Sequence, residues 1–154
     1  MRNMIPDAIL PAGAARARAI AHVSIATPDA EATAREYAAL LGATIRSRET
    51  LEARGLHVVF LDCAGLPIEL IQPIDPASET NTVAKFLKTR GPGLHHVAFF
   101  VDDAAAALGH ARNAGARLVD EAPRPGADGC LVAFLHPAAT SGVLVEYVEA
   151  APTP

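Results

Sequence analysis

Short apolar runs, many of them rich in valine and isoleucine, recur along the chain and predict two groups of four β-strands. These strands are expected at about residues 20–26, 43–49, 56–62, 66–72, 94–101, 116–120, 131–135 and 143–148. After the first strand of each group, apolar residues recur at helical spacing, over 30–41 and again from Asp103 to a stop at Gly115. Each group therefore predicts a strand, a helix and three further strands.

The two groups also resemble each other in sequence. The segment HVSIA that starts at His22 returns as HVAFF from His96, and IELI around Glu69 returns as VEYV around Glu146. A single duplication with small insertions explains both pairs. We therefore expect one domain over residues 20–148, built from a βαβββ module repeated in tandem.

The module boundaries follow from this repeat. The modules are predicted at 20–72 and 94–148, and the connector 73–93 contains a short candidate helix at 82–89. Residues 1–19 are interpreted as an N-terminal extension and 149–154 as a C-terminal tail. Prolines and charged residues interrupt the one apolar patch of the extension, so we expect neither a signal peptide nor a membrane span there.

Composition and charge narrow the class of protein. Hydrophobic residues make up 51% of the 154 positions and charged residues 19%, which is typical of a globular protein. The formal net charge of −4 argues against general binding to nucleic acid or to an anionic membrane. The two cysteines, Cys63 and Cys130, do not form the pattern of a secreted disulfide framework, so we expect a reduced, cytoplasmic setting.

The repeated histidines and glutamates are the candidate chemistry. A single histidine in an apolar strand is more often a hydrogen-bonded core residue than a ligand, so His22 alone is weak evidence. A carboxylate in the middle of an apolar strand is costly unless it is paired or binds a metal, and Glu69 and Glu146 both occupy such positions. If His22, Glu69, His96 and Glu146 share the concave face of a sheet, they could hold one divalent metal ion, with Co, Ni, Mn and Zn all compatible.

Several neighbouring polar residues have weaker patterns. His95 should point away from His96 in a regular strand, so we interpret it as structural or as a support for the ligands. Gln72 and Glu149 lie three residues beyond the glutamates and are expected on the opposite face. His136 ends a strand near the Pro- and Gly-rich loop 123–129 and is a candidate substrate contact, although a hydrogen-bonded surface histidine is the somewhat stronger alternative.

Longer motifs carry a family resemblance. The chain resembles the vicinal oxygen chelate superfamily and, within it, the methylmalonyl-CoA epimerases, over residues 20–148. The segments that carry this resemblance are TVAKFL, GPGLHHVAFFVDD, DEAPRPG and, above all, FLHPAATSGVLVEYVE. It implies an α+β, glyoxalase-like fold in which two βαβββ modules form a curved eight-stranded mixed sheet. It also implies a homodimer and places the metal ligands at His22, Glu69, His96 and Glu146.

The resemblance implies an activity as well. An epimerase of methylmalonyl-CoA, or of a related 2-alkylmalonyl-CoA thioester, removes the α-proton and returns it to the opposite face through a metal-stabilised enolate. Glu146 and Glu69 are the expected bases. Some epimerases carry a catalytic glutamate at the position of Val58, where this chain has no base. The phosphates of coenzyme A need cations, and the candidates in or beside the two connecting loops are Lys85, Lys88, Arg90 and Arg124.

Two other functions fit the same residues. A glyoxalase I-like lactoylglutathione lyase, which moves a proton along a hemithioacetal of glutathione, would use the same four ligands. A metal-free protein of the same fold that binds a small drug belongs to a different class and predicts no tight metal. An Fe(II) extradiol dioxygenase needs a more open ligand set, and a fourth protein ligand at Glu69 argues against it.

Overall fold

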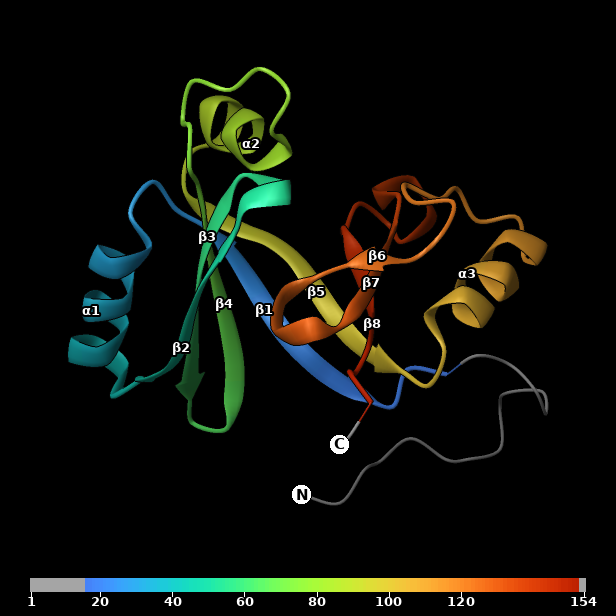
Figure 1. The fold of residues 1–154 in the computed structure, drawn as a ribbon, viewed down its shortest axis with the longest axis horizontal. Coiled ribbons are helices and arrows are strands. Elements are labelled where there is room, and N and C mark those ends of the chain that lie inside the picture. Colours follow the sequence, from blue (N-terminus) through green and yellow to red (C-terminus); the bar gives the residue numbers. More distant parts are fainter. Residues whose placement is uncertain (1–15, 153–154) are drawn as a thin grey trace.

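A curved mixed sheet forms the body of the protein in the computed structural model, which describes residues 16–152 (Figure 1). Its eight strands run in the order β2-β3-β4-β1-β5-β8-β7-β6. The strands are β1 (Ala19–Ala26), β2 (Thr44–Leu51), β3 (Leu56–Cys63), β4 (Leu66–Pro73), β5 (Gly93–Val101), β6 (Arg124–Pro125), β7 (Leu131–Leu135) and β8 (Val145–Glu149). The helices are α1 (Ala30–Leu41), α2 (Thr82–Arg90) and α3 (Ala104–Asn113), with short 3₁₀ turns at η1 (Glu52–Arg54), η2 (Ala127–Gly129) and η3 (Pro137–Ala139).

The strand order repeats between the two halves. Each half places its first strand beside its last one in a parallel pair, β1 with β4 and β5 with β8, while the other neighbours are antiparallel. The antiparallel pair β1–β5 joins the halves at the centre of the sheet. The prediction of two βαβββ modules in one curved mixed sheet is therefore confirmed.

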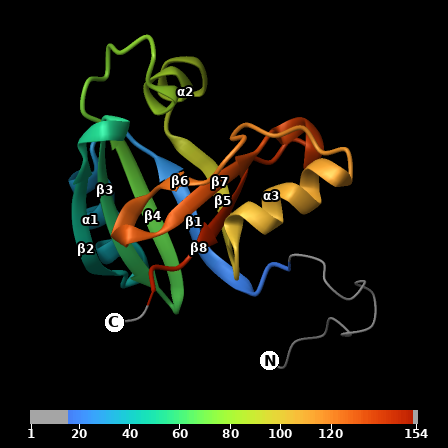
Figure 2. The ribbon, with the colours of Figure 1, turned by 45° about the vertical axis from the view of Figure 1, so that its right-hand side comes forward.

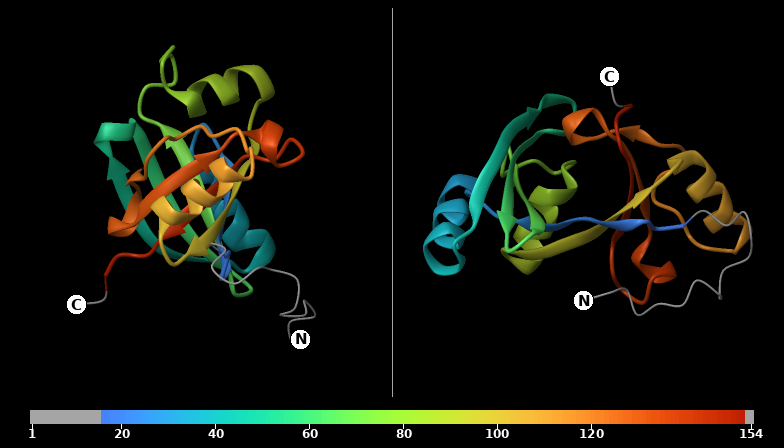
Figure 3. Two further views of the ribbon diagram at one scale, coloured as in Figure 1. Left: turned by 90° about the vertical axis from the view of Figure 1, so that its right-hand side faces the viewer. Right: turned by 90° about the horizontal axis from the view of Figure 1, so that it is seen from below.

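Helices α1 and α3 cover the convex side of the sheet at its two ends (Figure 3). Each begins at an aspartate whose carboxylate accepts from a backbone amide of the first turn, Asp29 from Ala32 N at 2.9 Å and Asp103 from Ala106 N at 2.8 Å. Apolar faces of the helices then pack on strand side chains, such as Ala34 on Leu70. Because both helices lie outside, the concave face stays available for a site.

Polar side chains on the convex face hold the helix starts to the sheet. Gln72 Oε1 accepts from Ala30 N at 2.9 Å, and Glu149 Oε2 accepts from Ala104 N at 2.8 Å. Both side chains thus lie on the face predicted from the sequence, opposite the glutamates three residues earlier. Glu149 was assigned to the tail in the sequence analysis, but it is the last residue of β8.

The predicted strand at 116–120 is wrong. This segment makes one isolated bridge, Leu118 with Leu135, and the sixth strand is instead the two-residue β6. The cause is Asp120, whose carboxylate accepts from Phe134 N at 2.8 Å and so takes the amide that a neighbouring strand would use. The amides of Val119 and Asp120 both turn to Phe134 O, so no regular ladder forms.

The segment from β6 through η2 to β7 reaches across to the first module (Figure 2). Asp128 N donates to Glu49 Oε2 of β2 at 3.0 Å, which ties the two ends of the curved sheet together. Residues 1–15 of the predicted extension and 153–154 of the tail lie outside the described part of the chain. Between residues 16 and 152, none of the helices combines the length and the apolar character needed to cross a membrane.

Candidate metal centre and active site

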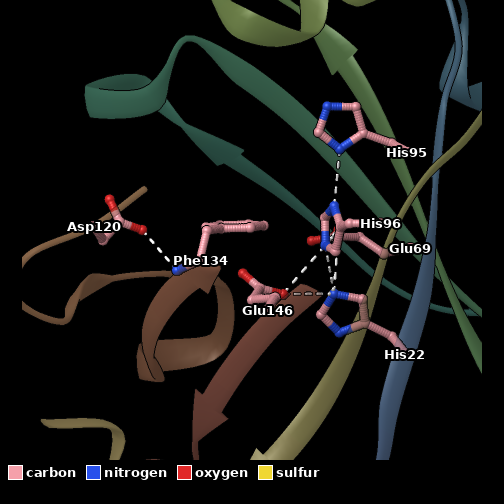
Figure 4. Close-up of polar contacts among 7 residues, drawn as sticks. All are labelled: His22, Glu69, His95, His96, Asp120, Phe134 and Glu146. Carbon is pink, nitrogen blue, oxygen red and sulfur yellow. Dashed lines mark hydrogen bonds and ion pairs between the residues drawn. The ribbon is translucent and has the colours of Figure 1, made fainter. Parts of the chain in front are cut away.

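Four strands bring the predicted ligands to one point on the concave face (Figure 4). His22 comes from β1, Glu69 from β4, His96 from β5 and Glu146 from β8. Strand register explains the convergence. Ala98 lies beside both His22 and Glu146, and its repeat counterpart Ser24 lies beside both His96 and Glu69. The ligand candidates therefore occupy a crossed, pseudo-symmetric arrangement around the central strand pair.

The distances within this cluster are short. The Nε2 atoms of His22 and His96 lie 3.2 Å apart. Glu146 Oε2 lies 3.0 Å from His22 Nε2 and 3.2 Å from His96 Nε2, whereas Glu69 Oε2 lies 3.4 and 3.6 Å from the same two atoms. Both imidazoles thus present Nε2 to both carboxylates.

Burial strengthens the electrostatic interactions between the two imidazoles and the two carboxylates. All four side chains are buried, and Glu146 is 3% exposed. Burial alone would raise the pKa of Glu146, but hydrogen bonds to His22 and His96 outweigh it, so the pKa is lowered and the carboxylate is ionised. Burial likewise works to lower the pKa of His22, yet Glu146 and Glu69 raise it overall.

Three residues of the cluster, His22, Glu69 and His96, could together hold a divalent metal ion. Ligand atoms at about 2.1 Å from one ion lie about 3.0–3.4 Å from each other at tetrahedral or right angles. The nitrogen–oxygen and nitrogen–nitrogen separations of 3.0–3.6 Å found here match that spacing. His22, Glu69 and His96 each offer one ligand atom within 4.8 Å of the others. An imidazole and carboxylate set suits several first-row metals, so the residues do not select one.

His95 departs from the expectation that it points away from His96. Its Nδ1 lies 2.9 Å from His96 Nδ1, and its side chain lines the same cavity. The cause is a β-bulge, because Ser24 pairs with His96 and Ile25 with Leu94, which leaves His95 as the extra residue of β5. Burial and the neighbouring His96 lower the pKa of His95 to about 4, so its ring is neutral near pH 7.

The same irregularity recurs in the first module. Ile20 pairs with Phe99 and His22 with Ala98, so Ala21 is the extra residue of β1 and is the repeat counterpart of His95. Each bulge directly precedes a histidine of the cluster. Both halves therefore contain the same β-bulge, but the extra residue carries an imidazole in one half and a methyl group in the other.

A cavity of about 400 Å³ opens beside the cluster. Its walls are mainly apolar, with Leu51, Ile71 and Leu144 among them, while two arginines, Arg54 and Arg124, supply positive charge. Arg54 was missed in the sequence analysis. It lies in the turn η1 between two strands, where no periodic pattern marks a functional residue.

Val58, at the position where some epimerases carry a catalytic glutamate, lies among apolar side chains. It is 1% exposed and packs in a cluster with Leu56, Ile71 and Val83. No carboxylate from this position reaches the cavity.

A second cavity of about 280 Å³ also adjoins the cluster, and His22 is among its lining residues. Ala21, Phe60 and Cys130 line it, and it shares Arg54, Glu69 and Glu146 with the first cavity. Arg54 and the two glutamates of the cluster therefore border both cavities.

The remaining predicted contacts lie in different places. Lys85 and Arg90 line a third cavity of about 410 Å³, which adjoins the first and shares His95 and His96 with it. Lys88 is exposed on α2, the same helix. His136 Nδ1 instead accepts from Ala138 N at 3.1 Å at the start of η3, and the side chain lines none of the cavities described above.

Arg124 differs from these cations in its partners. Its Nε donates to Asp120 Oδ1 at 3.0 Å, and its guanidinium lies 5.5 Å from the centre of the Phe134 ring. It reaches the first cavity rather than the third.

Comparison with known proteins decides the family. The model of the glyoxalase/bleomycin resistance protein/dioxygenase superfamily matches residues 21–134. The chain belongs to this superfamily. A relative in the superfamily, the ethylmalonyl-CoA/methylmalonyl-CoA epimerase of Cereibacter sphaeroides, is 39% identical over 127 residues, which cover 81% of this chain and 92% of the relative. The human mitochondrial methylmalonyl-CoA epimerase is 36% identical over 84% of this chain and 72% of its own length.

Solved structures of the superfamily agree. The crystal structure of methylmalonyl-CoA epimerase from Mycobacterium tuberculosis superimposes with a TM-score of 0.81 at 34% identity, over 88% of this chain and 90% of that one. The resemblance to the epimerase branch of the superfamily, and the expectation of an isomerase, are thereby confirmed.

Proposed function

We propose that the protein is a metal-dependent epimerase of methylmalonyl-CoA or of a related 2-alkylmalonyl-CoA thioester. The observation that carries this proposal is the convergence of two imidazoles and two ionisable carboxylates beside a cavity that continues into a lysine- and arginine-lined groove. Related structures support the substrate class. The Streptomyces coelicolor methylmalonyl-CoA epimerase, 32% identical with a TM-score of 0.80, was solved with 2-nitronate-propionyl-CoA, and another relative with methylmalonyl-CoA.

His22, Glu69, His96 and Glu146 would hold the ion in this proposal. A bound divalent ion would supply Lewis-acid stabilisation of the negative charge that develops on the thioester oxygen. A buried carboxylate then removes the α-proton from one face, and a second carboxylate returns a proton to the other. Glu146 and Glu69 come from opposite modules, so each approaches from its own half of the site.

His95 has a positioning role in this mechanism. Its neutral ring can accept the Nδ1 proton of His96, which leaves His96 Nε2 with a free lone pair directed at the cluster. The apolar walls of the first cavity exclude water from the proton-transfer step.

Coenzyme A would run from the first cavity into the groove along α2. Lys85 and Arg90 line that groove, and Lys88 lies on the same helix, so the three cations can meet the phosphates. The resemblance also supports a homodimer, which light scattering at working concentration tests directly.

Deuterium exchange tests the proposed activity. The metal-free protein is reloaded separately with Co, Ni, Mn or Zn and incubated with methylmalonyl-CoA in deuterated water, and a parallel sample receives the hemithioacetal of glutathione and methylglyoxal. We expect deuterium at the α-carbon of the thioester and both epimers in the product. Turnover of the hemithioacetal alone would replace the proposal by a glyoxalase I-like lyase. Tight small-molecule binding with neither turnover nor metal would favour a drug-binding protein.

A further inference from the structure

Arg54 is a cation at the centre of the site without an acidic partner of its own. It lines both cavities that flank the metal cluster. Within residues 16–152, no carboxylate lies within ion-pair distance of its guanidinium, although Arg18, Arg48, Arg112 and Arg124 each have such a partner. Its charge is therefore available to a ligand.

Arg124 provides a direct contrast inside the same cavity. Asp120 neutralises Arg124 at 3.0 Å and is itself fixed by Phe134 N. The two glutamates that share both cavities with Arg54, Glu69 and Glu146, already face the two imidazoles. Of the two arginines, only Arg54 lacks an anion that compensates its burial.

Because the guanidinium of Arg54 is partly buried, its charge is destabilised as long as no anion binds it. Burial and the positive charge of Arg124 lower the pKa of Arg54 from its ordinary value, while the negative charges of Glu146 and Glu69 oppose that shift. A guanidinium that is partly removed from water gains most from a planar, two-oxygen anion such as a carboxylate, which it can bind through two parallel hydrogen bonds.

The turn that carries Arg54 is held in place by the connector. Asn81 Nδ2 donates to the carbonyl oxygens of Arg54 at 3.0 Å and Gly55 at 3.2 Å, and Asn81 Oδ1 accepts from Val83 N and Ala84 N at the start of α2. Gly55 has a φ of 63°, which suits glycine. One side chain thus fixes both the arginine and the helix whose cations line the groove.

We propose that Arg54 binds the free carboxylate of the substrate and so makes the site specific for malonyl-type thioesters over simple acyl-CoA thioesters. This inference rests on the proposed function, because it presumes a coenzyme A thioester in the first cavity. The carboxylate that distinguishes a 2-alkylmalonyl thioester from a simple acyl thioester is attached to the reacting carbon, so its binding site must adjoin the metal cluster. Arg54 meets that requirement, whereas Lys85 and Arg90 line the groove and Lys88 lies on the same helix.

A matched pair of ligands tests this assignment. Affinities of the metal-loaded protein for methylmalonyl-CoA and for propionyl-CoA, which lacks the carboxylate, are measured by calorimetry for wild type, Arg54→Met and Arg54→Lys. Loss of a charged hydrogen-bond partner should weaken methylmalonyl-CoA binding by about 10- to 100-fold in Arg54→Met and leave propionyl-CoA binding within about twofold. Arg54→Lys should retain part of the preference. The control Arg35→Met, on the exposed side of α1, should behave as wild type.

The outcomes separate the two proposals. Equal weakening of both ligands by Arg54→Met, or no weakening of either, overturns the role of Arg54 if wild type still prefers methylmalonyl-CoA and exchanges its α-proton. A wild-type protein that neither prefers that thioester nor exchanges the proton overturns the proposed function and this inference together. Circular dichroism of each variant confirms folding, and Arg54→Lys carries the test should Arg54→Met fail to fold.

Discussion

Replacement of Glu146 by glutamine should separate proton removal from epimerisation. In the two-base mechanism each carboxylate serves one face of the α-carbon, and epimerisation needs both, whereas exchange of the α-proton with solvent needs one. Glu146→Gln keeps an oxygen that can coordinate a metal but can no longer accept a proton. We therefore expect bound metal, very slow epimerisation and residual exchange.

The structure sets the expected size of the effect. Loss of a general base costs about two to four orders of magnitude in rate, or about 2.7–5.4 kcal/mol in activation free energy. Glu146 is 3% exposed and Val58 offers no carboxylate, so neither solvent nor a side chain at position 58 can replace the base on this face of the α-carbon. We expect a loss of about four orders of magnitude in the epimerisation rate.

Separate epimers make the assay decisive. Each epimer of methylmalonyl-CoA is incubated in deuterated water with Glu146→Gln or with Glu69→Gln, and deuterium uptake is followed by mass spectrometry while metal content is measured on the same samples. The two variants should exchange opposite epimers, because Glu146 and Glu69 come from opposite halves of the sheet. Near-normal epimerisation by metal-loaded Glu146→Gln would show that Glu146 is a ligand only, and the base would then be sought at Glu69 or a metal-bound water.

Three further measurements probe the cluster and its surroundings. A divalent metal at 100 times its dissociation constant should stabilise the protein by about 2.7 kcal/mol and so raise Tm by about 5–11 °C. The buried His96→Ala variant should lose this rise in Tm, and the control His110→Ala, at an exposed position, should keep it. Ser24→Ala should raise the free energy of unfolding by about 1 kcal/mol in urea titrations, because the buried Ser24 hydroxyl has no hydrogen-bond partner; a decrease would point to an unrecognised partner. The lowered pKa of Glu146 stabilises the metal-free fold above the unfolded-state pKa of about 4.3, and this contribution should disappear as pH falls through the lower folded-state value. Glu146→Gln should therefore show a smaller acid-induced fall in urea midpoint.

The repeat made the fold and the residues of the candidate metal centre predictable. The duplication predicts that His22 and His96 occupy equivalent positions, as do Glu69 and Glu146, and strand alternation predicts which neighbours share the face of each. That the four meet on one concave face depends on strand pairing, which the structure supplies. Gln72 follows from the same alternation and is confirmed at the helix start.

The errors arise where a neighbouring strand decides the local geometry. His95 points toward the site because its strand bulges against β1, and bulging depends on pairing register rather than on the local sequence. Residues 116–120 have the composition of a strand, but Asp120 captures the amide that the ladder would need. Arg54 has no periodic signal because it lies in a turn, and its importance depends on which cavities meet there.

The spacing of polar residues on β4 and β8 has a consequence for how the protein avoids misfolding. Each strand carries an inward glutamate and, three residues later, an outward side chain that receives a helix amide. A slip of one residue would turn both to the wrong faces at once, removing a proposed metal ligand from the concave side and a helix anchor from the convex side. A shifted register would therefore lose contacts on both faces of the sheet and be less stable than the native one. The same short segments therefore carry both the proposed chemistry and the signal for a unique strand alignment, so the site can change through substitution of its side chains but not through sliding of its strands.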